Sequence, residues 1–378
     1  MKIGIIGGGQ LGKMMTLEAK KMGLFVTVLD PALHCPSSSI SDEHIIANFD
    51  DVGAIRELAS KSDVLTYEFE HIDCKSLIEL EGEGKKIYPT AKSLMIIRDK
   101  LTQKQALKEG SAPVGDFIKV GSIDDINRIS LDYGFPFLLK TRTGGYDGKG
   151  NYLVKNAQEI ETAYNVLGNG KLPLMAERFI DFEMEISVLA CRTQKGETVV
   201  YPASQNNHEN NILQETKVPA NMSEQTEKEA IKAALLVMDV FKGVGMFCTE
   251  MFVLKNGSVL INEVAPRPHN SGHYSIEGCV TSQFENHIRA ICDLPLGSTD
   301  LIRPSVMRNI LGADTPNDGN AIVEGLQQAL AVEGVKVHIY GKEKSKPQRK
   351  MGHLTVTAET LKLAEERANR AWSYIKIY

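Results

Sequence analysis

Short apolar runs alternate with longer amphipathic stretches over the first hundred residues. Residues 2–6 predict a buried strand, and the glycine-rich loop after them predicts a helix that runs to about residue 22. Two more strands are expected at 25–29 and 64–67, with a helix at 51–60 between them. Strands that alternate with helices form a parallel sheet with helices on its faces. We therefore expect an N-terminal parallel-sheet, Rossmann-like domain at residues 1–97.

The remaining pattern predicts two further α/β units. The expected strands lie at 137–140, 174–179, 185–191, 247–253, 259–264, 335–340 and 352–356, and the expected helices at 99–109, 224–241 and 358–374. We place a smaller central domain at 98–186. The C-terminal domain is expected at 187–378, with a small β-rich part at its end.

Composition and charge exclude several classes of protein. The chain has 378 residues, 42% of them hydrophobic and 24% charged, and a net charge of −5, which argues against broad binding to nucleic acid or anionic membranes. Its six scattered cysteines form no Cys-x-x-Cys pair, so we expect reduced thiols rather than disulfides or a zinc site. No apolar run approaches the length of a membrane span, and the first residues read as a strand rather than a signal peptide. We expect a cytoplasmic protein.

The first glycine-rich loop allows two interpretations. Gly7, Gly9 and Gly12 match the pattern G-x-G-x-x-G between a strand and a helix, and Asp30 ends the second strand. That arrangement is typical of a dinucleotide site, with the carboxylate on the ribose. The loop can equally be a tight strand–helix turn, or can bind another anion at the helix N-terminus.

A second glycine-rich loop favours phosphate binding. Residues 144–150 read Gly-Gly-Tyr-Asp-Gly-Lys-Gly and follow a strand that ends at Lys140. The backbone N–H groups of such a loop can surround phosphate oxygens, and Lys140 and Lys149 add positive charge. It is not a Walker loop, because Gly150 stands where that motif has Ser or Thr. So much glycine is entropically costly to order without a ligand, which disfavours a hairpin with nothing bound.

The sequence also predicts an opposed pair of carboxylates. Asn256-Gly257 is typical of a two-residue type I′ hairpin turn. In that register the facing residues are Leu254 with Val259, Phe252 with Ile261, and Glu250 with Glu263. Two carboxylates about 5 Å apart repel by about 3 kcal/mol at an effective dielectric constant of about 20. Because the flanking pairs are apolar, solvated glutamates on an edge hairpin are disfavoured, and Mg²⁺ completed by substrate phosphates resolves the repulsion. Asn262 points to the other face in this register and can reach the metal only if the chain twists.

Polar residues cluster directly after this hairpin. Residues 265–273 contain two prolines that favour an extended loop, and they present Arg267, His269, Asn270 and His273. The cluster predicts an anion pocket beside the metal.

A later basic run supplies candidates for a phosphate site. Its members are Lys342, Lys344, Lys346, Arg349 and Lys350. Lys344 and Lys346 are interpreted as solvated charges, and a phosphate needs only one or two residues from the strand ends.

Taken together, these segments resemble the ATP-grasp superfamily and, within it, the N5-carboxyaminoimidazole ribonucleotide synthetase family of purine biosynthesis. The segments that carry the resemblance are 7–12, 66–70, 144–150, 260–273, 340–342 and 349–353. The resemblance implies an ATP-grasp α/β fold with three domains. It also implies an ATP-dependent ligase that carboxylates 5-aminoimidazole ribonucleotide with bicarbonate, through carboxyphosphate, and releases ADP and phosphate.

The resemblance also implies residue roles, with ATP between the second and third domains. ATP would contact Lys100, Lys140, Gly144, Gly145, Tyr146, Asp147, Gly148, Lys149, Gly150, Glu177, Arg178, Phe179, Ile180, Glu185, His208, Asn262 and Glu263. The ribonucleotide would contact Gln10, Leu11, Glu68, Tyr146, Asp147, Lys149, Arg267, His269, Asn270, Lys342 and Arg349. Mg²⁺ would be held by Glu250 and Glu263, and the catalytic residues would be Asp147, Arg267, His269 and Asn270. The family also implies a homodimer, with no nucleic-acid or membrane partner.

The chain departs from the family at Lys100, where an arginine is usual, and lysine lacks the bidentate fork of arginine. In this family the opening glycine loop borders the ribonucleotide and binds no dinucleotide.

Three alternatives remain open from the sequence. Another ATP-grasp enzyme, such as a formate-using glycinamide ribonucleotide transformylase or a biotin carboxylase, would share the metal pair but lack the combination of Tyr146-Asp147 with His269-Asn270. An NAD-linked oxidoreductase would explain the first glycine loop and Asp30 but not the opposed glutamates. A nucleotide-binding regulator without catalysis is the third.

Overall fold

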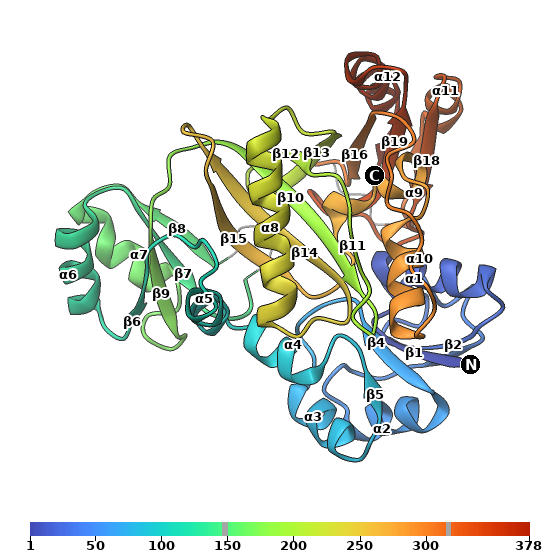
Figure 1. Cartoon of the computed structure of the whole chain (residues 1–378), viewed down its shortest axis with the longest axis horizontal. Coiled ribbons are helices and arrows are strands. Elements are labelled where there is room, and N and C mark those ends of the chain that lie inside the picture. The colour runs from blue at the N-terminus through green and yellow to red at the C-terminus, as the bar shows by residue number, and fades with distance from the viewer. Residues whose placement is uncertain (146–149, 315–318) are drawn as a thin grey trace.

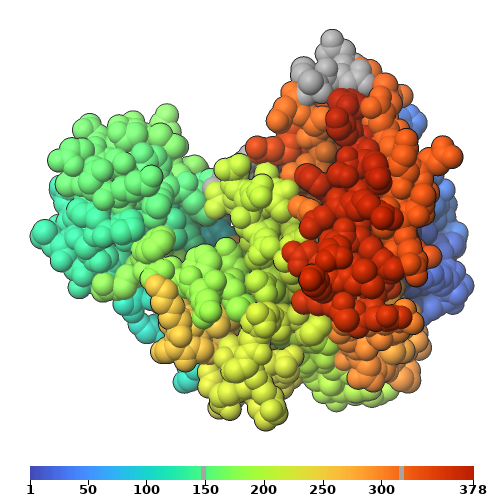
Figure 2. Space-filling view, turned by 90° about the horizontal axis from the view of Figure 1, so that it is seen from above, coloured from blue at the N-terminus to red at the C-terminus, as the bar shows by residue number. Residues whose placement is uncertain are grey.

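The computed structural model describes residues 1–145, 150–314 and 319–378. The three larger sheets organise the chain into an N-terminal unit, a central unit that projects to one side, and a large third unit (Figure 1). The space-filling view shows the molecule hollowed between the central unit and the rest (Figure 2). In the described ranges, no helix combines the length and the apolar character that crossing a membrane requires.

The N-terminal unit is the predicted parallel sheet. Its five strands lie in the order β3-β2-β1-β4-β5 and are all parallel. They are β1 (Lys2–Ile6), β2 (Phe25–Leu29), β3 (Glu43–Ile45), β4 (Val64–Tyr67) and β5 (Lys86–Ile87), with helices α1 (Gln10–Lys21), α2 (Val52–Lys61), α3 (Cys74–Gly82) and α4 (Ala91–Ile97). β1 is buried from Ile3 to Ile6 because both of its faces are covered: Ile3 and Ile5 pack on one side and Ile6 on the other.

The central unit is a four-stranded antiparallel sheet in the order β6-β9-β7-β8. Its elements are β6 (Phe117–Val120), α6 (Ile123–Tyr133), β7 (Phe137–Thr141), β8 (Asn151–Val154), η1 (Ala157–Glu159), α7 (Ile160–Val166) and β9 (Leu174–Arg178). The linking helix α5 (Lys100–Glu109) precedes it. α6 begins at a capping box, in which Ser122 and Asp125 each bond the other's backbone amide. The second glycine loop joins β7 to β8.

The third unit is one continuous sheet. The strand order is β15-β14-β10-β12-β13-β16-β19-β18, with β11 also on β10. The strands are β10 (Phe182–Arg192), β11 (Thr198–Val200), β12 (Ser204–Glu209), β13 (Ile212–Val218), β14 (Gly245–Leu254), β15 (Val259–Ala265), β16 (Ser305–Leu311), β18 (Val335–Ile339) and β19 (Lys350–Thr357). The β-rich C-terminal part therefore extends the same sheet, because β16 pairs with β13.

Helices cover this sheet and join it to the N-terminal unit. They are η2 (Asn270–Gly272), α8 (Glu224–Val240), α9 (Ser275–Gly278), α10 (Gln283–Ile291), α11 (Leu326–Leu330) and α12 (Leu361–Tyr374). A separate antiparallel pair is formed by β17 (Val323–Glu324) and β20 (Lys376–Ile377). α8 packs an alanine-rich face against β10 and β14. α10 shares a core with α1 and the N-terminal sheet through Phe284, Ile288 and Ile291, which fixes the third unit against the first.

Candidate active site

One cavity of about 860 Å³ is lined by residues from all three units. The predicted site residues that line it are Gln10, Leu11, Glu68, Lys100, Lys140, Gly145, Phe179, Glu185, His208, Glu250, Asn262, Glu263, Arg267, His269 and Asn270. This volume lies in the range of sites that enclose small-molecule ligands.

The hairpin that carries the two glutamates differs from the predicted one near its turn. The amide of Gly257 donates to the carbonyl of Leu254, and the amide of Leu254 to the carbonyl of Ser258, so the loop has three residues. Gly257 has φ +82°, a left-handed conformation that glycine adopts without strain. The predicted two-residue turn is wrong, and so are the pairs Phe252–Ile261 and Leu254–Val259. Phe252 faces Leu260 instead.

A β-bulge restores the predicted register at the carboxylates. Met251 pairs with Ile261, and the register then shifts so that Glu250 pairs with Glu263, as predicted. Asn262 is the extra residue of the bulge. Bulges bend a strand and re-aim its side chains, and Asn262 lines the cavity together with both glutamates. The bulge thus supplies the twist that the ideal register lacks.

The charges around the two glutamates differ. The Nζ of Lys100 lies 2.7 Å from Oε2 of Glu263. Burial acts to raise the pKa of the Glu263 carboxyl, but the Lys100 ammonium outweighs it and the pKa lies below its usual value. Burial raises the pKa of the Glu250 carboxyl, an effect that His208 opposes and Glu263 reinforces. Glu250 is therefore a half-buried carboxylate whose negative charge is incompletely neutralised.

This pair fits a hard divalent cation. Carboxylate oxygens, with an amide oxygen at Asn262, are the donors that Mg²⁺ takes. Throughout the ranges that the structure describes, no group of three or more His, Cys, Asp or Glu side chains could hold a metal ion by itself. The remaining ligands of a cation at Glu250 and Glu263 would have to come from water or from substrate phosphates.

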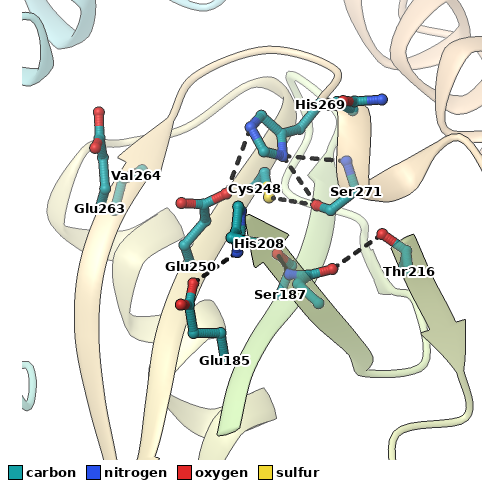
Figure 3. Close-up of polar contacts among 12 residues, drawn as sticks. Glu185, Ser187, His208, Thr216, Cys248, Glu250, Glu263, Val264, His269 and Ser271 are labelled. Carbon is teal, nitrogen blue, oxygen red and sulfur yellow. Dashed lines mark hydrogen bonds and ion pairs between the residues drawn. The ribbon is translucent and has the colours of Figure 1, made fainter. Parts of the chain in front are cut away.

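His208 forms an ion pair beside the carboxylates. Its Nδ1 lies 2.9 Å from Oε2 of Glu185, although the two atoms are not aligned as a hydrogen bond. Burial lowers the pKa of the imidazole, but the Glu185 carboxylate outweighs it, so the pKa of His208 is raised. His208 lies between Glu185 and Glu250 (Figure 3).

Lys140 does not act alone at the end of β7. Its Nζ lies 2.9 Å from Oε2 of Glu177, and the Nζ of Lys104 lies 3.4 Å from the other oxygen. Burial acts to raise the pKa of the Glu177 carboxyl, but the two ammonium groups outweigh it and lower the pKa to about 2. Glu177, predicted at the adenine, does not line the cavity. Lys104 was not among the predicted site residues, although it lies one helical turn after Lys100 on α5.

The loop after β15 presents a neutral histidine. Nδ1 of His269 accepts from the backbone amide of Ser271 at 3.4 Å and lies 2.9 Å from the Ser271 hydroxyl. Burial, reinforced by the charge of Arg267, holds the pKa of His269 well below its usual value. A neutral ring that accepts at Nδ1 carries its proton on Nε2. Nε2 lies 3.5 Å from Oε1 of Glu250 (Figure 3).

Arg267 joins the third unit to the first. Its Nε lies 2.8 Å from Oε1 of Glu70, and a second guanidinium nitrogen lies 3.4 Å from Oε2. Glu70 lies in the segment 66–70 and was not among the predicted site residues. The planar, two-point contact fixes the guanidinium at the cavity wall.

The first glycine loop already holds a carboxylate of this chain. The amides of Gly9 and Gly12 donate to the two oxygens of Glu68 at 2.5 and 2.7 Å, and the amide of Gly8 donates to Asp30 at 2.9 Å. A Cβ on Gly9 would lie 2.5 Å from Oε1 of Glu68, so this approach requires glycine. The N–H groups that a pyrophosphate would need are occupied. This arrangement argues against the dinucleotide interpretation.

The basic run reaches the cavity through a different residue from those predicted. Lys350, the first residue of β19, lines the cavity, whereas Lys342 and Arg349 do not. The Nζ of Lys342 donates to the carbonyl of Lys350 at 2.6 Å, and its charge acts on the Glu68 carboxyl. Arg349 is exposed and donates to the carbonyl of Lys344 at 2.7 Å.

Some predicted residues lie elsewhere. Gly144, Gly150, Arg178 and Ile180 do not line the cavity, and Arg178 forms an ion pair with Asp116. Tyr146, Asp147, Gly148 and Lys149 lie outside the described residues. The lining residues that sequence analysis did not assign are Phe69, Glu70, His71, Leu138, Asn151, Leu153, Phe182, Asn211, Leu213, Phe252, Ala265 and Lys350. Phe182 and Phe252 stack with their ring centroids 4.5 Å apart.

Family models match successive parts of the chain. The ribonucleotide synthetase preATP-grasp domain matches residues 1–98, the ATP-grasp domain matches 105–284, and the phosphoribosylaminoimidazole carboxylase C-terminal domain matches 305–367. The predicted ATP-grasp α/β fold with its N-terminal parallel-sheet domain is confirmed.

Individual relatives cover nearly the whole chain. The N5-carboxyaminoimidazole ribonucleotide synthase of Bacillus subtilis (strain 168) is 42% identical over 93% of this chain and 90% of that protein. The crystal structure of the synthetase from Thermotoga maritima is 45% identical, with a TM-score of 0.90 over 100% of this chain and 99% of that one. The Aspergillus clavatus synthase in complex with ADP and 5-aminoimidazole ribonucleotide is 35% identical, with a TM-score of 0.91 over 98% and 97%. With this identity along its length, and with the carboxylate pair and the arginine–histidine loop in one cavity, the chain belongs to the N5-carboxyaminoimidazole ribonucleotide synthase family of ATP-grasp proteins.

Proposed function

We propose that this protein uses ATP and bicarbonate to carboxylate 5-aminoimidazole ribonucleotide, and that it releases N5-carboxyaminoimidazole ribonucleotide, ADP and phosphate. The observation that carries the proposal is that one cavity contains residues for a metal–phosphate site and residues for an adjacent anion site. Glu250, Asn262 and Glu263 provide oxygen donors for a cation and its phosphates, and Arg267 and His269 provide donors for an anion beside them.

The proposed reaction has two steps, and different residues act in each. In the first, a bicarbonate oxygen attacks the γ-phosphorus of ATP, the bond to the bridging oxygen of ADP breaks, and carboxyphosphate forms. Lys100, Lys140 and the amides of the second glycine loop would hold the phosphates. Mg²⁺, when bound at Glu250 and Glu263, offsets negative charge on the phosphoryl oxygens.

In the second step, carboxyphosphate gives CO₂ and phosphate. The amine nitrogen of the ribonucleotide bonds to the CO₂ carbon, and the nitrogen loses a proton. Arg267 contributes a fixed positive charge and His269 contributes the N–H on Nε2, and both would stabilise the anionic intermediate. The deep, partly apolar cavity would limit hydrolysis of that intermediate by water.

We extend the proposal to the remaining roles implied by the family. ATP would contact Glu177, Arg178, Phe179, Ile180, Glu185 and His208. The ribonucleotide would contact Gln10, Leu11, Glu68, Asn270, Lys342 and Arg349. Residues 1–97, 98–186 and 187–378 would act as the three domains of a cytoplasmic homodimer.

A turnover assay tests the function. ATP hydrolysis with Mg²⁺ and bicarbonate should be slow without 5-aminoimidazole ribonucleotide and should rise strongly when it is added. The carboxylated product should be trapped with ¹⁴C-bicarbonate. Turnover stimulated by formate instead, or an ATPase rate indifferent to the ribonucleotide, would overturn the proposal.

The basic run gives a prediction that separates the two substrates. Lys342→Ala and Arg349→Ala should each raise the KM for the ribonucleotide about tenfold or more, because a charge-assisted phosphate contact is worth about 1.5–3 kcal/mol. The KM for ATP should stay within about twofold of the parent value. Lys350→Ala should be measured alongside them, because Lys350 lines the cavity. Lys344→Ala is the control, because Lys344 is exposed. A selective rise in the KM for ATP would assign the run to the nucleotide instead.

A further inference from the structure

Two buried amide side chains outside the cavity hold the loop that carries His269 and Asn270. Gln283 is the first residue of α10, and Asn309 lies on β16. Both are fully buried, and neither lines the cavity. Neither was assigned a role by sequence analysis, and the catalytic steps proposed above do not use them.

The side-chain amide of Gln283 forms hydrogen bonds with both the backbone N–H and the backbone C=O of His269. Its Oε1 accepts from the His269 amide at 2.9 Å, and its Nε2 donates to the His269 carbonyl at 2.7 Å. The same nitrogen lies 3.2 Å from Nδ1 of His273. A Cβ on Gly272 would lie 2.5 Å from Oε1 of Gln283, so the loop follows the amide closely. The clamp fixes the peptide planes on both sides of His269, and the contacts of its Nδ1 with Ser271 hold the ring.

Asn309 holds the side chain of the next residue, Asn270, through a reciprocal pair of amide hydrogen bonds. Nδ2 of Asn270 donates to Oδ1 of Asn309 at 3.0 Å, and Nδ2 of Asn309 donates back to Oδ1 of Asn270 at 2.7 Å. Nδ2 of Asn309 also donates to the carbonyl of Leu213 at 2.7 Å. The C-terminal part of the sheet therefore reaches the active-site loop directly.

A neutral amide satisfies these partners, and an ionised carboxylate does not. Each clamp uses one acceptor and one donor group on the same planar end, which a carboxylate or an aliphatic side chain cannot supply. We propose that Gln283 and Asn309 are positioning residues that orient His269 and Asn270 for the reaction with carboxyphosphate. This inference rests on the proposed function. Displacing a reacting group by about 1 Å can cost about 10²-fold in rate, and loss of an outer supporting contact at a metal site about 10–100-fold.

Apolar replacements of similar size test the clamps. Gln283→Met and Asn309→Leu should each lower kcat about 10–100-fold and leave the KM for ATP within about twofold, because the nucleotide is held by other residues. Gln328→Met and Asn127→Leu are matched controls at exposed positions and should leave kcat unchanged. A kcat within twofold of the parent in both test variants would overturn the proposal. So would an equal loss of ATP affinity, which indicates general damage to the fold.

Carboxyl variants add a readout that a merely structural role would not give. A protonated carboxyl at position 283 can donate and accept like the amide, whereas an ionised one can only accept. The kcat deficit of Gln283→Glu should therefore grow as the pH rises from 6 to 9, while the deficit of Gln283→Met should stay constant. A pH-independent ratio of Gln283→Glu to the parent would contradict the clamp.

A measurement on the unaltered protein separates this inference from the proposed function. The amide of His269 should exchange with deuterium much more slowly than exposed loop amides, whatever the enzyme catalyses. Fast exchange would contradict the clamp even if turnover is as proposed. Slow exchange with no turnover of the ribonucleotide would contradict the proposed function alone.

Discussion

Glu250→Gln and Glu263→Gln should each lower kcat about a thousandfold. Each change removes one negative charge from the paired carboxylates that we propose hold Mg²⁺. A cation that neutralises charge on a transferred phosphoryl group is worth several kcal/mol in the transition state. A loss of about 4 kcal/mol corresponds to about three powers of ten in rate. Steady-state ATP turnover at saturating Mg²⁺, bicarbonate and ribonucleotide measures the effect. Exposed Glu183→Gln on β10 is the control.

The same two variants should differ in stability without metal. The raised pKa of Glu250 means that its ionised form is disfavoured in the fold, so a neutral amide should raise the melting temperature at neutral pH. The pKa of Glu263 is lowered, so its ionised form stabilises the fold above the usual carboxyl pKa, and Glu263→Gln should lower the melting temperature. Melting temperatures that both rise or both fall would refute the charge assignment. In the turnover assay described above, a near-normal rate in either variant would refute the metal assignment.

Arg267→Ala should lower kcat about 10²–10³-fold, with a smaller change in the KM for ATP. A fixed donor aimed at developing negative charge is worth about 3–4 kcal/mol in a site that excludes water. Glu70 holds the guanidinium at two points, so its position is set before substrate arrives. Arg267→Lys should recover only part of the rate, because lysine keeps the charge and loses the fork.

Arg56→Ala is a matched control for this variant. Arg56 also contacts two carboxylate oxygens of Glu83, but on the exposed surface, where such pairs contribute little. Single-turnover kinetics with trapped ¹⁴C-bicarbonate would place the Arg267 defect in the chemical steps. A normal chemical step with weakened ATP binding would move Arg267 from the anion pocket to the nucleotide.

The fold was predictable wherever local pattern decides structure. The apolar runs at 2–6, 25–29 and 64–67 coincide with β1, β2 and β4. Strands of a parallel sheet are buried on both faces, so they appear in the sequence as continuous apolar runs with well-defined ends. The carboxylate pair was predicted from a turn that does not form. The three-residue loop shifts the pairing by one residue from the predicted register, and the bulge at Glu250 shifts it back. No pattern in the sequence indicates this bulge.

Long-range contacts in the site were not predictable in the same way. Lys350 reaches the cavity rather than Arg349 because β19 begins at residue 350, a difference of one position within a run of similar charges. Gln283 and Asn309 reach His269 and Asn270 across 14 and 39 residues. Such partners are chosen by the packing of α10 and β16, and their polarity alone does not distinguish them from surface amides.

The carboxylate of Glu68 makes the first glycine loop a receptor that carries its own ligand. Backbone amides at the start of a helix can bind a phosphate, but here the amides of Gly9 and Gly12 donate to a side chain of the same chain. A tethered group competes at an effective concentration of the order of millimolar, without the loss of translational freedom that a free anion suffers. The loop thus keeps a glycine pattern typical of nucleotide sites, while its Gly9 and Gly12 amides are already bound by a carboxylate of the same chain.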